Sequence, residues 1–276
     1  MEPAEARLFS ATAPGSGDFT DLLRAKGILP QMPMNTGLAG GRALAGSENF
    51  TPTHGTTILA FKYAEGVLVA GDRRATAGNL VVYDRADKVI EIDPHSLMAI
   101  AGVPATAWEM ARVLEHSLQF YRRSQLQEMS LDGKVRALSK LLRDNLGFVL
   151  QGVGVVVPIF ATFDHAAEVP RLYFYDAMGA QFEAADYAAT GSGSAAIRGV
   201  LHYENTWGKN TLLKLKESDA LILALRALDT AAESDTATGG VDRRGRVYPI
   251  VKLIKPGGIT TLPEKDLARV FKTSVA

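Results

Sequence analysis

The sequence has no cysteine among its 276 residues. This absence excludes a disulfide framework, a thiolate metal site and a cysteine nucleophile, so any chemistry must come from oxygen and nitrogen groups. An excess of charge is missing too, because 30 lysines and arginines are matched by 30 aspartates and glutamates. A nucleic-acid binder normally needs a positive field to meet the phosphates, so we expect no nucleic acid partner.

Long apolar runs are also absent. No stretch approaches the roughly 18 apolar residues of a membrane span, and the first seven residues lack the basic and apolar regions of a secretory signal. We therefore expect a soluble, cytoplasmic protein with no membrane partner. The five histidines never approach metal-ligand spacing, so no metal site is expected.

The N-terminal segment, residues 1–55, is rich in Gly, Pro, Ser, Thr and Ala and is unlikely to fold alone. Its one ordered-looking piece is residues 18–29, where Phe19, Leu22, Leu23 and Ile28 form a short apolar stripe. The stripe is typical either of a marginal helix in a flexible tail or of a helix that docks on the following domain. Both interpretations remain open.

From residue 56 onward the pattern predicts regular structure. Two apolar, β-branched runs, residues 56–61 and 66–70, are typical of an antiparallel hairpin. The other predicted strands are 79–83, 89–92, 97–101, 155–163, 171–176, 182–190, 247–254 and 258–262, and the predicted helices are 104–125, 135–149, 194–203, 220–232 and 263–272. This order predicts an α+β fold. Two stacked sheets with helix pairs outside would bury all these faces in four layers.

The junction Gly55-Thr56 is the first candidate for chemistry. If the chain were cut before Thr56, this residue would carry a hydroxyl nucleophile and a free α-amine that could act as its base. A strand threonine alone is usually structural. Asp72 closes the second predicted strand and Lys88 begins the fourth. If both side chains point toward Thr56, the buried lysine lowers the pKa of the neighbouring hydroxyl or amine, and the aspartate compensates the charge of the lysine. The alternative is that Asp72 and Lys88 are ordinary solvated charges at strand ends.

Three glycine-containing turns follow. Residues 191–194, Gly-Ser-Gly-Ser, lie between a strand and a helix and suit an anion cradle, a hydroxyl-supplying turn or a tight connection. They lack the third glycine of a dinucleotide fingerprint. Residues 235–240, Asp-Thr-Ala-Thr-Gly-Gly, end a predicted helix as a C-cap would. Gly102 marks a strand-to-helix turn whose N–H could instead face a developing oxyanion.

Six motifs, taken in order along the chain, resemble those of 20S proteasome β subunits. They are Gly-Thr-Thr-Ile, Ala-Gly-Asp-Arg-Arg-Ala-Thr, Lys88, Ala-Gly at 101–102, Gly-Ser-Gly-Ser and Asp-x-x-Thr-Gly-Gly. The resemblance extends from residue 56 to about residue 262. The lack of cysteine, the Thr-Gly-Gly ending and the long N-terminal extension are similar to the actinobacterial type. The resemblance implies the four-layer αββα sandwich of N-terminal nucleophile hydrolases, with residues 1–55 as an autocatalytically removed propeptide and residues 56–276 as the catalytic domain.

The resemblance also implies the residues of a threonine endopeptidase. Thr56 resembles the nucleophile, Lys88 the residue that tunes its pKa, and Asp72 the partner of the lysine. Among the family's other catalytic positions, Gly102 corresponds to the oxyanion donor. Ser192 and Asp235 correspond to the residues that orient the amine and its water. Thr238 lies where many relatives have serine. The first specificity pocket corresponds to Ala75, Ile100 and Pro104, an apolar set that suggests cleavage after apolar residues, while Thr76 and Gly78 would pair with the substrate backbone as an added strand.

For the precursor, we expect the Thr56 hydroxyl to attack the Gly55 carbonyl, forming an ester that water hydrolyses to release residues 1–55. Glycine suits position 55 because a side chain would crowd the tight turn needed for attack. The mechanism requires no metal or organic cofactor. The implied partners are proteasome α subunits, other β subunits in heptameric rings stacked between α rings, an ATPase ring, and the unfolded or tagged proteins it delivers.

Three alternatives remain. One is a subunit of the simpler bacterial two-ring ATP-dependent threonine protease, which also begins Thr-Thr-Ile but is shorter and would not need the strands near residues 160–190. Another is a small-molecule amidase with the same fold. The third is a structural ring subunit without activity, against which the intact Gly55-Thr56, Asp72 and Lys88 argue.

Overall fold

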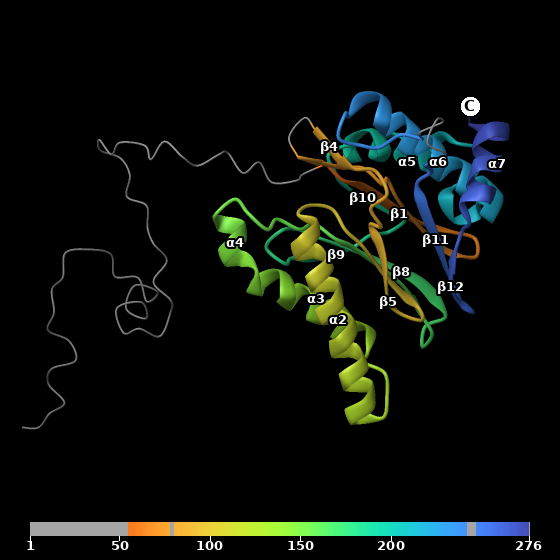
Figure 1. The fold of residues 1–276 in the computed structure, drawn as a ribbon. Coiled ribbons are helices and arrows are strands. Elements are labelled where there is room, and N and C mark those ends of the chain that lie inside the picture. Colours follow the sequence, from red (N-terminus) through yellow and green to blue (C-terminus); the bar gives the residue numbers. More distant parts are fainter. Residues whose placement is uncertain (1–54, 78–79, 242–246, 276) are drawn as a thin grey trace, which may run out of the picture. The chain divides into compact units, whose positions relative to one another are not determined.

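The computed structural model describes residues 55–77, 80–241 and 247–275 (Figure 1). The predicted apolar stripe at residues 18–29 and the predicted substrate-pairing residue Gly78 lie outside these ranges. The division into a propeptide and a catalytic domain at residue 55 therefore stays a prediction.

The first sheet holds the predicted hairpin. β1 (Thr57–Tyr63) and β2 (Gly66–Gly71) pair antiparallel at its centre. Three further strands complete the order β10-β1-β2-β11-β12: β10 (Tyr187–Gly191), β11 (Ile250–Lys255) and β12 (Gly258–Thr261). Every residue of β2 is buried, which is the pattern of a strand covered on both faces.

The second sheet is also antiparallel and five-stranded. Its order, β5-β6-β7-β8-β9, follows the sequence: β5 (Val89–Asp93), β6 (Ser96–Ala99), β7 (Ile159–Asp164), β8 (Val169–Tyr175) and β9 (Gln181–Glu183). A separate two-stranded hairpin, β3 (Ala75–Ala77) and β4 (Leu80–Tyr83), lies between β2 and β5 in the chain.

The helices form the two outer layers, as Figure 1 shows. On one side lie α2 (Pro104–Gln125), α3 (Leu131–Asp144) and α4 (Leu146–Leu150); on the other lie α5 (Ser194–Trp207), α6 (Glu217–Ser234) and α7 (Glu264–Ser274), with a short 3-10 turn at Leu212–Lys214. No helix within the described ranges has both the length and the hydropathy of a membrane span.

Side-chain alternation along the central strands separates the layers. In β1, Leu59 and Phe61 pack in the cluster that joins the first sheet to α5 and α6, whereas Ile58 and Ala60 pack in the cluster between the sheets. A third cluster joins the second sheet to α2 and α3 through residues such as Phe160. The predicted four-layer αββα fold is confirmed.

The prediction of one strand over residues 182–190 was wrong. This stretch forms β9 at the edge of one sheet and β10 at the edge of the other, so the chain changes sheets between them. Similarly, the helix predicted over 135–149 is divided at Asn145, whose side-chain amide donates to the Gly154 carbonyl at 2.7 Å. Apolar periodicity is a local signal and cannot report which sheet a residue joins.

Candidate active site

Thr56 lies at the entrance to β1, where three strands of the first sheet meet. It is 3% exposed, and its carbonyl accepts the N–H of Ser192 at 3.1 Å. The next residue, Thr57, is opposite Gly191 of β10, and Ile58 is opposite Gly71 at the end of β2. The ends of β2 and β10 therefore deliver Asp72 and Ser192 to the neighbourhood of Thr56.

Lys88 and Asp72 form a buried ion pair, with 2.6 Å between Nζ and Oδ1 and side chains only 4% and 0% exposed. The Lys88 ammonium also donates to the Arg74 carbonyl at 2.5 Å and to the Gly55 carbonyl at 3.5 Å. Burial lowers the pKa of Lys88 from its ordinary value, while the charge and hydrogen bond of Asp72 oppose this shift. The predicted partnership of these two side chains is thus present in the structure.

The Asp72 carboxylate is held by backbone donors as well. Its Oδ1 accepts the Thr57 N–H at 2.8 Å, and its Oδ2 accepts the N–H groups of Arg74 at 3.0 Å and Gly239 at 2.9 Å. Together with Lys88, these donors fill the acceptor sites that a carboxylate offers. A buried charge that is paired and fully hydrogen-bonded can be tolerated in the core.

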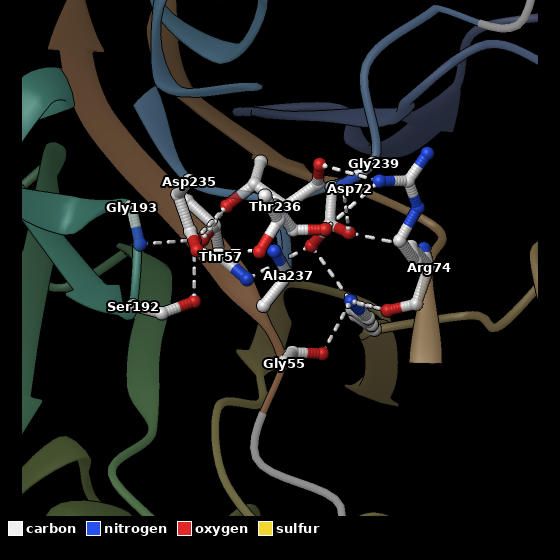
Figure 2. A network of polar contacts seen from close by, with 12 residues as sticks. Gly55, Thr57, Asp72, Arg74, Ser192, Gly193, Asp235, Thr236, Ala237 and Gly239 are labelled. Carbon is white, nitrogen blue, oxygen red and sulfur yellow. Dashed lines mark hydrogen bonds and ion pairs between the residues drawn. The ribbon is translucent and has the colours of Figure 1, made fainter. Parts of the chain in front are cut away.

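A second network surrounds Asp235, which follows α6. Its Oδ2 accepts the hydroxyls of Ser192 and Thr238, each at 2.5 Å, and its Oδ1 accepts the Ala237 N–H at 3.1 Å. Burial alone would raise the pKa of Asp235, but these hydrogen bonds and the nearby Arg74 charge hold it below its ordinary value. The structure thus brings together the three candidate residues Ser192, Asp235 and Thr238. Figure 2 shows Ser192 beside Asp235.

A cavity of about 270 Å³ lies beside Lys88 and Thr56. Its lining combines the candidate nucleophile and lysine with mostly apolar side chains: Thr56, Ala75, Tyr83, Ala86, Lys88, Ile100, Gly102, Pro104 and Trp108. Three residues predicted for a specificity pocket, Ala75, Ile100 and Pro104, therefore share one cavity with Thr56. Tyr83, Ala86 and Trp108 were missed because nothing in their local sequence marks them as site residues.

Gly102 lines the same cavity in a conformation that suits glycine. Its φ is +118°, and an added Cβ would lie 2.0 Å from the Val155 carbonyl oxygen. Gly102 forms an isolated antiparallel bridge with Val156, but the bridging hydrogen bonds are donated by the N–H groups of Val103 and Val157. The bridge therefore does not use the Gly102 N–H, which is the group required of an oxyanion donor.

The space around Gly55 is closed. A Cβ added there would lie 2.1 Å from the Thr76 Oγ1 and 2.9 Å from the Ala237 Cβ. Thr76, predicted to pair with substrate, is itself 4% exposed on β3. The structure thus gives a direct steric reason for glycine before Thr56.

Two polar residues of the site, Arg74 and Thr57, were not predicted from the sequence as site residues. Arg74 Nη1 donates hydrogen bonds to the carbonyls of Thr236 at 3.0 Å and Thr238 at 3.3 Å. These hydrogen bonds connect the turn after α6 to the end of β2. Thr57 lies between the two networks (Figure 2). The local signal was their position in the chain, since Thr57 follows Thr56 directly and Arg74 lies two residues after Asp72. Within the described ranges, no three His, Cys, Asp or Glu side chains gather as metal ligands.

Comparison with known proteins covers the same part of the chain. The family model described as proteasome subunit matches residues 52–244, which include both networks and the cavity. The chain is 41% identical over 222 residues to proteasome subunit beta 2 of Thermomonospora curvata, spanning 80% of this chain and 77% of the relative. Identity to the proteasome subunit beta of Streptomyces griseus is 36% over 261 residues (94% and 88%), and to that of Jonesia denitrificans 39% over 220 residues (80% and 70%).

Proposed function

Because the chain belongs to the proteasome subunit family, which assembles with other proteasome subunits, we propose that it is a catalytic β subunit acting as a threonine endopeptidase. The observation that carries this proposal is the placement of Thr56 on one cavity with a buried, ion-paired Lys88. Burying an ion pair is costly, and this one shares its cavity with the candidate nucleophile, which supports a catalytic role for the pair.

The first step is self-cleavage. The Thr56 hydroxyl attacks the Gly55 carbonyl carbon, the bond to the Thr56 nitrogen breaks, and residue 55 is transferred to Oγ1 as an ester. Water then hydrolyses the ester, leaving a carboxylate on Gly55 and a free amine on Thr56. Two observations support this step. The Lys88 ammonium lies 3.5 Å from the Gly55 carbonyl oxygen, where negative charge develops. In addition, a side chain at residue 55 would collide with Thr76 and Ala237.

The second step is peptide hydrolysis. An unperturbed α-amine has a pKa of about 7.7 to 8.0, so the freed Thr56 amine is partly neutral near pH 7 and can accept the hydroxyl proton through water. Thr56 Oγ1 attacks the substrate carbonyl, the Gly102 N–H donates to the oxyanion, and water hydrolyses the acyl-enzyme. The Ser192, Asp235 and Thr238 network orients the amine and this water.

The cavity favours a substrate class. Ala75, Ile100 and Pro104, with Trp108, present an apolar lining that suits an apolar side chain before the scissile bond. Thr76 of β3, with Gly78, pairs with the substrate backbone as an added strand. The partners are α subunits, further β subunits in heptameric rings, and an ATPase ring that delivers unfolded or tagged proteins in the cytoplasm.

The test compares the wild-type chain with Thr56→Ala, each co-expressed with its α partner. We expect the assembled wild type to lose residues 1–55 by intact mass and to hydrolyse a peptide with an apolar residue before the cleaved bond. Thr56→Ala keeps the extension and cleaves nothing. A wild-type assembly that retains its extension and is inactive on peptides would instead identify a structural ring subunit.

A further inference from the structure

Thr57 forms hydrogen bonds with both polar networks, through its backbone to Asp72 and through its hydroxyl to Thr238. Its side chain and backbone are 0% exposed. Its N–H donates to Asp72 Oδ1 at 2.8 Å, the same oxygen that accepts Lys88 Nζ, and its carbonyl accepts the Asp72 N–H at 3.1 Å. On the other side, its hydroxyl accepts the Gly193 N–H at 3.0 Å and lies 2.6 Å from Thr238 Oγ1.

The direction of the hydroxyl chain follows from the number of protons. Asp235 is an ionised carboxylate and can only accept, so the single proton of Thr238 is donated to its Oδ2. The Thr57 hydroxyl must therefore donate to Thr238 Oγ1, and its own oxygen accepts from Gly193. The order is Gly193 N–H to Thr57, Thr57 to Thr238, and Thr238 to Asp235, with every donor satisfied.

The Thr57 and Thr238 hydroxyls pack closely against Gly193. A Cβ added to Gly193 would lie 2.6 Å from Thr238 Oγ1 and 3.0 Å from Thr57 Oγ1. A β-branched side chain in a strand is also restricted at χ1, so the Thr57 hydroxyl is held in one direction.

Resting on the function proposed above, we infer that Thr57 is a positioning residue, whose hydroxyl holds Thr56 at the reacting position once the preceding chain has been cut away. Before cleavage, residue 56 is tethered by peptide bonds on both sides. After cleavage it is held covalently only through Thr57, together with the hydrogen bond from the Ser192 N–H to its carbonyl. Loss of the Thr57 hydroxyl therefore weakens turnover more than self-cleavage.

The test uses Thr57→Val, which keeps the shape and removes the hydroxyl, and Thr57→Ser, which keeps the hydroxyl. Each is assembled with the α partner and measured for loss of residues 1–55 and for kcat and KM on a peptide. We expect Thr57→Val to lower kcat by about 10-fold to 100-fold with KM unchanged, because misplacement of a reacting group affects the chemical step. Thr57→Ser stays within about threefold of wild type, because it retains the group that positions Thr56.

Thr162→Val is the matched control. Thr162 is also a buried strand threonine, with its hydroxyl 2.9 Å from the Ser96 hydroxyl and 2.9 Å from the His95 carbonyl, away from the cavity. It should lose stability as Thr57→Val does and keep wild-type kcat. A drop in kcat of equal size in this control assigns the effect to general destabilisation and overturns the inference.

Other outcomes are equally decisive. Wild-type kcat in Thr57→Val, or an equal loss in Thr57→Ser, contradicts a role for the hydroxyl. If Thr57→Val does not assemble, Thr57→Ala, which cannot crowd the Gly193 N–H, is compared with Thr57→Ser, and equal kcat values contradict the inference. An inactive, unprocessed wild type overturns the proposed function instead.

Discussion

The Lys88 ammonium has three protons and three acceptors in the structure: the Asp72 carboxylate and the carbonyls of Arg74 and Gly55. One of these acceptors belongs to the segment that the proposed self-cleavage removes. When Gly55 leaves, one Lys88 proton loses its acceptor beside Thr56. The same ammonium can therefore first polarise the Gly55 carbonyl and later stabilise negative charge on the Thr56 hydroxyl oxygen.

Replacing Lys88 by methionine tests this role. We expect Lys88→Met to stop self-cleavage and peptide hydrolysis and to lower the free energy of unfolding by about 3–5 kcal/mol, since it leaves Asp72 buried without its countercharge. Lys252→Met is the control, because Lys252 is also buried and pairs with Glu91 at 3.0 Å, but from β11. Intact mass, peptide hydrolysis and chemical denaturation measure the three quantities. Retained self-cleavage in Lys88→Met would contradict the assigned role.

The pH dependence of kcat follows from the lowered pKa of Lys88. Activity that needs the ammonium is lost as pH rises through this pKa, so the basic limb lies below the ordinary lysine value of 10.5. The Arg74 charge contributes to the lowering, so Arg74→Gln should move the basic limb to higher pH, while Arg74→Lys should leave it in place. A pH profile of kcat measures this, and an unmoved limb in Arg74→Gln excludes Lys88 as its source.

The stability contribution of Lys88 has the opposite pH dependence. Below the lowered pKa both the folded and the unfolded chain hold the proton, and the cost of burying the ammonium is complete. Between the folded and unfolded pKa values the unfolded chain binds more protons, so this cost is relieved as pH rises. Loss of activity on the basic side is therefore not a consequence of unfolding driven by Lys88.

At the level of elements, the site is assembled from strand ends and the turns that follow them. β1 begins after Thr56, β2 ends before Asp72, and β10 ends before Ser192, while Gly102 lies between β6 and α2. Strand ends suit an active site because sheet hydrogen bonds fix the backbone of the strand, while the residue just beyond the strand lies outside the regular strand pairing. Where the backbone must also turn sharply, glycine with positive φ appears, as at Gly102 and Gly191.

Gly102→Ala tests the turn between β6 and α2. The added Cβ would meet the Val155 carbonyl at 2.0 Å and φ is unfavourable for alanine, so the turn must shift and the N–H with it. We expect kcat to fall about 100-fold or more, as when an oxyanion donor is removed. Gly199→Ala in α5 is the control, since its Cβ would meet nothing within 4 Å and should stabilise the helix by about 0.4–1 kcal/mol. Normal turnover by Gly102→Ala would rule out this N–H as the oxyanion donor.

In the folded unit as a whole, the site spans the two sheets. Thr56 and Asp72 come from the first sheet, whereas Lys88 precedes β5 of the second. The apolar cluster between the sheets, which includes Ile58, Val69 and Leu97, therefore sets the distance from the lysine to the threonine. A close-packed core transmits changes in volume to the groups it supports.

Two leucine substitutions test this dependence. Leu97→Ala removes a fully buried side chain between the sheets, and Leu201→Ala removes one between the first sheet and the outer helices. Each should lower the free energy of unfolding by about 2–5 kcal/mol. Only Leu97→Ala should also lower kcat, because it relaxes the packing that places Lys88 and Thr56 on the same cavity. Equal kcat in the two variants, measured at a temperature where both are folded, would contradict this.

Residue types and their spacing along the chain were enough to predict the chemical groups of the site and the order of most elements. The absence of cysteine, the hydroxyl after a glycine, the carboxylate and ammonium at strand ends and the alternating apolar runs are all local, and local periodicity predicts local structure. These observations were sufficient for an α+β fold and for Thr56, Asp72 and Lys88 as candidates, whereas the αββα sandwich was implied by the resemblance to proteasome β subunits.

Which distant groups meet depends on the packing of the folded chain. The Thr57 and Thr238 hydroxyls are 181 positions apart in the chain, and Arg74 reaches carbonyls more than 160 positions away. The packing of the layers likewise divides residues 182–190 between the two sheets. Such contacts depend on how two buried faces fit together, a property of the whole folded chain that no single stretch of sequence encodes.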